Sequence, residues 1–179
     1  DFRQNVETEI ECTALSESED KGACVTEINL EKGCSIGIRQ ECAAKGGKFY
    51  KNMLCTSDRI AAGGVCKKTD KTTCKDDKVY FLDSCGNLAN IYDFNRINDP
   101  EYWDILLAEE ASCGAGESNT NSRNCGNCDY FRGSSCGAAK EVKPYKGNYV
   151  CKDINCKVDG KTVKNGEGWC AYDGDIGDG

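Results

Sequence analysis

Residues 79–114 read VYFLDSCGNLANIYDFNRINDPEYWDILLAEEASCG and hold the densest apolar side chains of the chain. From Val79 to Ser84 the side chains alternate with the two-residue period of a strand, and a second apolar run covers residues 88–92. Gly86 and Asn87 lie between these runs, and both residue types tolerate the positive φ of a tight turn. The sequence therefore predicts a β-hairpin at the centre of the fold.

A helix is predicted directly after this hairpin. Asp99 offers a side-chain cap, Pro100 suits the first helical position, and Glu101 lies near the positive end of the helix dipole. Gly114 is expected to end the helix. The two aromatic residues of its apolar face could stack on a sugar, but the leucines beside them favour packing in the core; this face comprises Tyr102, Trp103, Ile105, Leu106 and Leu107.

The chain divides into three predicted regions around this stretch. Residues 1–34 are expected to form an acidic extended arm, in which residues 25–30 alternate like an edge strand that could add to a neighbouring subunit's sheet. Residues 35–114 are expected to form a cluster of helices and hairpins around the central hairpin and the Asp99-capped helix. Residues 115–179 are expected to form a module of short strands held by disulfides.

Shorter patterns predict the smaller elements. They indicate a short helix over residues 35–44, a tight hairpin over residues 48–55 and a solvated charged loop over residues 67–78. Asp159-Gly160 and Asn165-Gly166 are hairpin-turn dipeptides. Together these patterns predict a small disulfide-rich fold of mixed α+β class, with short β-hairpins, two or three short helices, much irregular structure and no single large core.

The cysteine content indicates an oxidised protein of the extracellular space or cell surface. Fifteen cysteines among 179 residues approach the level of disulfide scaffolds. Fifteen is odd, so at least one cysteine lacks an intrachain partner, and Cys12 is the first choice for it. That thiol is expected to be buried, bonded outside this chain, or used in an intersubunit bridge. The predicted disulfide cysteines are Cys12, Cys24, Cys34, Cys42, Cys55, Cys66, Cys74, Cys85, Cys113, Cys125, Cys128, Cys136, Cys151, Cys156 and Cys170, with connectivity left open.

Charge and composition argue against several classes of partner. The formal net charge is -7 and the sequence pI about 4.8, so the chain repels phosphate backbones and anionic lipid. We therefore expect no nucleic-acid partner, and no window is apolar enough for a membrane span. The chain has no histidine, which removes the commonest general base and zinc ligand.

Two cysteines have the C-x-x-C spacing of redox and zinc sites, Cys125 and Cys128. A redox site needs a helix N-terminus that the surrounding sequence does not predict. A zinc site could add Cys151 and Cys156, but thiolates in an oxidising compartment favour disulfides. Structural disulfides are therefore the preferred interpretation.

Three acids near the end of the chain suggest a calcium site. Asp173, Asp175 and Asp178 lie in DGDIGDG, a turn rich in oxygen ligands. Gly177 stands where the calcium-loop pattern places its third acid, so a solvated turn is the preferred interpretation.

Three groups of motifs together resemble a cysteine-rich module of large secreted or surface proteins of archaea. They are YFLDSCGNLANIYD (80–93), NDPEYWDILL (98–107) with CGNCDY (125–130), and YVCKDINC (149–156) with NGEGWCAYDG (165–174). That family has no assigned function, so the resemblance implies a scaffold and a location but no catalytic residue. The module continues beyond the last motif in that family, which implies that this chain is part of a longer protein.

We therefore expect a non-enzymatic structural subunit or module of an extracellular filament, sheath or surface appendage. Its expected partners are further copies of itself or other surface proteins, joined by strand addition or an intersubunit disulfide. The alternative is a secreted adhesin or glycan-binding module, with calcium as a possible aid.

Overall fold

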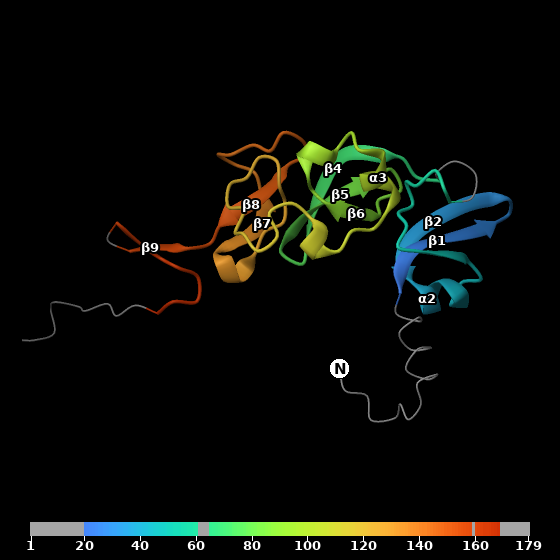
Figure 1. Ribbon diagram of the computed structural model, residues 1–179, viewed down its shortest axis with the longest axis horizontal. Coiled ribbons are helices and arrows are strands. Elements are labelled where there is room, and N and C mark those ends of the chain that lie inside the picture. The colour runs from blue at the N-terminus through green and yellow to red at the C-terminus, as the bar shows by residue number, and fades with distance from the viewer. Residues whose placement is uncertain (1–19, 61–64, 159, 169–179) are drawn as a thin grey trace, which may run out of the picture.

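The computed structural model describes residues 20–60, 65–158 and 160–168 (Figure 1). Small antiparallel sheets dominate, so the expected mixed α+β class is corrected to a mostly β, disulfide-rich fold. The strands are β1 (Lys21–Ile28), β2 (Glu31–Ile38), β3 (Lys48–Lys51), β4 (Lys68–Lys75), β5 (Lys78–Asp83), β6 (Leu88–Ile91), β7 (Ser134–Ala138), β8 (Tyr149–Asp153), β9 (Cys156–Val158) and β10 (Lys161–Val163). The helices are α2 (Arg39–Ala44) and α3 (Pro100–Asp104), with the 3-10 turns η1 (Phe94–Arg96), η2 (Glu109–Ala111) and η3 (Tyr130–Arg132).

The N-terminal sheet has the order β2-β1-β3, which corrects two predictions. The edge strand expected at residues 25–30 is instead the central strand β1 together with the turn after it. Residues 48–51 pair with β1 rather than forming a hairpin of their own. Gly22 explains this pairing, because a Cβ atom there would lie 2.1 Å from the Tyr50 carbonyl oxygen. Only glycine lets β3 approach β1 so closely.

The predicted central hairpin is confirmed as β5 and β6, inside the sheet β4-β5-β6. Its turn contains Gly86 at a φ of 85°, and the Asp83 carboxylate accepts hydrogen bonds from the Cys85 and Asn87 amides. The charged segment expected to be a loop forms β4 instead. Thr72 in this strand is buried, while the lysines beside it are exposed. The strand thus packs a β-branched side chain against the protein and points its lysines to solvent.

The Asp99 cap is confirmed, but the helix it begins is shorter than predicted. The Asp99 carboxylate accepts a hydrogen bond from the Glu101 amide, and α3 then ends at Asp104 rather than near Gly114. Ile105 is extended because the chain here hydrogen-bonds to the segment after β3, through the Leu54 amide to the Asp104 carbonyl at 3.0 Å. Local helix signals are therefore overruled by pairing with a distant segment.

The buried side chain of Asn90 fixes this change of direction. Its amide nitrogen donates to the carbonyls of Tyr102 and Ile105 at 2.6 and 2.8 Å, and its oxygen accepts from the Leu107 amide at 2.8 Å. One side chain on β6 thus satisfies the polar backbone groups where α3 ends.

Burial is divided between two small clusters, as the sequence predicted. The larger cluster surrounds Phe81, whose ring centroid lies 5.1 Å from Tyr92 and 5.2 Å from Trp103. Tyr102 and Trp103 are 1% and 4% exposed, which confirms core packing. The smaller cluster lies in the N-terminal part, and Ile36 packs against both; its buried members are Ala23, Val25, Cys55, Ile60 and Cys66.

The C-terminal part consists of two strand pairs. β7 pairs with β8, and β9 pairs with β10 in the hairpin predicted at Asp159-Gly160, with Gly160 at a φ of 75°. Figure 1 shows the N-terminal sheet at one end of the long axis and β9 projecting away from β7 and β8 at the other. No helix of the described residues is long and apolar enough to cross a membrane.

Candidate functional site

Six disulfides hold the described part of the chain together. Five of them join cysteines 12 to 23 positions apart, and Cys74–Cys136 spans 62 positions between β4 and β7. The pairs are Cys24–Cys42, Cys34–Cys55, Cys66–Cys85, Cys74–Cys136, Cys113–Cys125 and Cys128–Cys151. The fold is therefore a chain of short covalent loops with one long-range tie.

This pairing corrects the zinc alternative at the C-x-x-C motif. Cys125 is bonded to Cys113 and Cys128 to Cys151, so neither offers a thiolate to a metal or to redox chemistry. Both cysteines are buried, which suits structural bridges. Cys12, the cysteine expected to be unpaired, lies outside the described residues, as does Cys170.

Within the described residues, the unpaired thiol is that of Cys156, which is exposed on β9. Cys156 lies opposite Val163 in a two-stranded sheet, so the outer edges of β9 and β10 have no partner strand within the described residues. Two exposed aromatic residues lie on η3 nearby in the fold: Tyr130 is 48% and Phe131 90% exposed. We call Cys156, Tyr130, Phe131 and the β9–β10 hairpin the C-terminal surface.

Asparagines join the members of the C-terminal surface. The Asn165 amide nitrogen donates to the Tyr130 carbonyl at 2.8 Å, and the Asn155 side chain accepts from the Asn165 backbone amide at 2.8 Å. The Ile154 amide also donates to the Gly133 carbonyl at 3.0 Å. The base of the hairpin is thereby tied to the η3 turn that presents the aromatic side chains.

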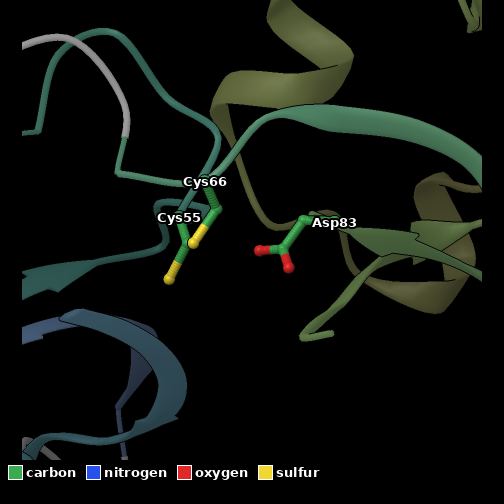
Figure 2. Close-up of side chains that lie close together, drawn as sticks. All are labelled: Cys55, Cys66 and Asp83. Carbon is green, nitrogen blue, oxygen red and sulfur yellow. The ribbon is translucent and has the colours of Figure 1, made fainter. Parts of the chain in front are cut away.

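A second cluster lies where the N-terminal and central sheets meet. Figure 2 shows the side chains of Cys55, Cys66 and Asp83 gathered there. The two sulfurs and a carboxylate oxygen lie within 4.8 Å of one another, and all three residues are buried. Each sulfur already belongs to a different disulfide, so these atoms are not metal ligands in the oxidised protein.

A groove with a mixed polar and apolar lining runs beside α3. It consists of two adjoining pockets of about 370 and 530 Å³, whose shared lining comprises Lys68, Asn98 and Trp103. Trp103 contributes little surface because it is 4% exposed and its indole nitrogen donates to the Ile97 carbonyl at 2.9 Å. Lys68 and Asn98 are therefore the polar side chains that the two pockets share.

Groups with shifted pKa values have structural causes. A hydrogen bond from Lys51 holds the pKa of Asp20 below its usual value, and one from Arg96 does the same for Asp99. Burial raises the pKa of Asp93 and the pKa of Tyr102, whose hydroxyl donates to the Ile91 carbonyl. These groups cap turns, form ion pairs or pack in the core, and they do not form an acid–base pair in a cleft.

The calcium prediction concerns residues that the structure does not describe. Asp173, Asp175 and Asp178 all lie in residues 169–179. The calcium site therefore stays a prediction from sequence.

No family model, curated protein or solved structure matches the chain. The resemblance to an archaeal cysteine-rich module thus remains a prediction from the motifs.

Proposed function

We propose that the protein is a non-enzymatic structural subunit of an extracellular assembly, such as a filament, sheath or appendage. The observation that carries the proposal is the exposed Cys156, which has no disulfide partner among the described residues and lies on a hairpin that projects from the body of the fold (Figure 1). An exposed thiol in an oxidising compartment is positioned for an intermolecular disulfide. The same compartment accounts for the high disulfide content.

The surroundings of Cys156 support a contact between two copies. Large apolar side chains that are almost fully exposed are frequent in interfaces, and Phe131 is 90% exposed. The open edges of β9 and β10 offer backbone groups for strand addition. The strand predicted for this role at residues 25–30 cannot accept a partner strand, because β1 is already paired on both sides. A Cys156–Cys156 bridge uses the same surface on both copies, so by itself it closes a dimer. A second, different contact would then be needed to join such dimers into a polymer.

The test uses the full oxidised chain and its Cys156→Ser variant. The wild-type chain is expected to give a disulfide-linked dimer on non-reducing gels and larger species by light scattering, whereas Cys156→Ser loses the covalent dimer. Phe131→Ser should weaken dimer formation, while Leu30→Ser, an equally exposed residue at the β1–β2 turn, should not. A wild-type chain that stays monomeric in both measurements would overturn the proposal.

The groove beside α3 favours a second candidate function, glycan binding by a secreted adhesin. Sugar recognition needs several hydrogen-bonding groups around a preformed hollow, and Lys68, Asn98 and Asp104 line such a hollow. Asn98→Ala is expected to abolish binding on a glycan array, while Asn148→Ala, at an exposed residue that lines neither pocket, leaves it intact. Absence of wild-type binding to any arrayed glycan would remove this candidate.

A further inference from the structure

We infer that the two abutting disulfides at the sheet junction form a relay for thiol exchange, with Cys85 as the site of entry. The ligand class is a small external thiol, such as a glutathione-like peptide. The inference rests on the cluster of Cys55, Cys66 and Asp83 and does not depend on the proposed assembly (Figure 2).

Exposure selects the point of attack. Among the half-cystines of the six described bridges, Cys85 alone is an exposed residue, and its partner Cys66 is 1% exposed. An external thiolate that attacks the Cys85 sulfur forms a mixed disulfide there, breaks the Cys66–Cys85 bond and leaves Cys66 as the thiolate.

The released Cys66 sulfur has a second disulfide within reach. Its atom lies within 4.8 Å of the Cys55 sulfur, and the Cys66 amide donates to the Cys55 carbonyl at 3.3 Å, so the two backbones are already paired. Attack of Cys66 on Cys55 forms a Cys55–Cys66 bond and breaks Cys34–Cys55. Cys34 leaves as a thiolate and takes its proton from water.

The surroundings of the sulfurs favour the negative charge on Cys34 over Cys66. A thiolate on the buried Cys66 would be desolvated and would lie beside the Asp83 carboxylate, and both effects disfavour it, while a long hydrogen bond from the Asn87 amide at 3.8 Å offsets only part of them. Cys34 is partly exposed, so its thiolate is better solvated. Two disulfides are present before and after the relay: one external thiol is consumed, one Cys34 thiol is released, and no oxidant or reductant is needed.

The consequence is a change in which segments are tied together. The Cys34–Cys55 bridge holds β2 to the segment after β3, and the relay replaces it with a local link between residues 11 positions apart. Thiol entry at Cys85 would therefore remove the covalent tie between the edge strand β2 and the segment after β3 and would leave a new thiol on β2, which stays paired with β1.

The test treats the oxidised Cys156→Ser chain with glutathione at mildly alkaline pH, followed by alkylation and tryptic mass spectrometry. Cleavage after Lys32, Arg59 and Lys78 places the four cysteines on separate peptides. The expected products are glutathione on Cys85, the alkyl label on Cys34 and a peptide pair joined by Cys55–Cys66.

Each other outcome counts against the relay. An alkyl label on Cys66 with Cys34–Cys55 intact would show that exchange stops at the first step, and equal adducts at several bridges would show no selective entry. The Cys34→Ala/Cys55→Ala variant provides a control, because it should still take glutathione on Cys85 and should then label Cys66. The signature of the relay is the alkyl label on Cys34, with Cys66 unlabelled, in the chain with both bridges, and the label on Cys66 in the control.

Discussion

Removal of the Cys74–Cys136 bridge is expected to destabilise the protein more than removal of a local bridge. This disulfide spans 62 positions, whereas Cys113–Cys125 spans 12. The loop-closure relation gives about 4.3 kcal/mol for the long bridge and about 2.8 kcal/mol for the short one, a difference of about 1.5 kcal/mol. The long bridge also connects β4 to β7. Without it, the segments that form the central and C-terminal sheets are free to move apart when the chain unfolds.

The assay is guanidinium unfolding followed by tryptophan fluorescence, with both double alanine variants made in the Cys156→Ser background. Cys74 and Cys136 are partly buried while Cys125 is buried, so packing losses work against the expected ranking and make the comparison strict. A Cys113→Ala/Cys125→Ala chain that is as unstable as the Cys74→Ala/Cys136→Ala chain would refute the claim that constraint of the unfolded chain dominates these bridges.

Three further predictions concern the folded state. Asn90→Ala leaves buried backbone groups without their partners and should lower the free energy of unfolding by about 2 to 4 kcal/mol. Asn148→Ala is the control in the same chemical unfolding assay, and a loss below about 0.5 kcal/mol for Asn90→Ala would contradict the role given to Asn90. Leu30 has a φ of 67°, so Leu30→Gly should raise stability by about 0.5 to 1 kcal/mol, and a loss of stability would exclude relieved strain. The pKa of Asp20 is lowered, so its contribution to stability is present above the unfolded pKa and lost as pH falls through the folded pKa. Asp20→Asn should therefore flatten the acid limb of a melting-temperature profile, and an unchanged limb would mean that the ion pairs with Lys51 and Arg39 contribute nothing.

Local patterns predicted those elements whose signals lie within a few residues. The hairpin of β5 and β6 was predictable because alternation and a Gly-Asn turn occur side by side in the sequence. The start of α3 was predictable because Asp99 and Pro100 act on their own turn. The division of burial into small clusters followed from the limited apolar content.

The end of α3 and the neighbours of β1 depend on contacts between distant segments. Asn90 lies on β6 and hydrogen-bonds to the backbone where α3 ends. Gly22 lets β3 pair closely with β1, although β3 lies more than twenty positions further along the chain. A lone glycine or asparagine within an apolar run is a weak signal, because many such residues have no special contact. Gly22 nevertheless lies inside a strand, where the close approach of another backbone is one physical reason for a glycine.

The candidate sites were the least predictable feature. Disulfide connectivity cannot be deduced from cysteine positions, so identifying Cys156 as an exposed free thiol among the described residues required the fold, and the expectation for Cys12 stays a prediction. The contact between two separate bridges at Cys55 and Cys66 also depends on how two sheets meet. Sequence could indicate many disulfides and an odd count, but not which sulfurs lie together.

The most direct test of the structural-subunit proposal is the state of Cys156 in native material purified with thiols blocked at lysis. Mass spectrometry of unreduced peptides is expected to find Cys156 joined to Cys156 of a second copy, and electron microscopy of the same sample to show ordered polymers. A Cys156 thiol that is fully alkylated, in a sample of dispersed monomers, would contradict the account.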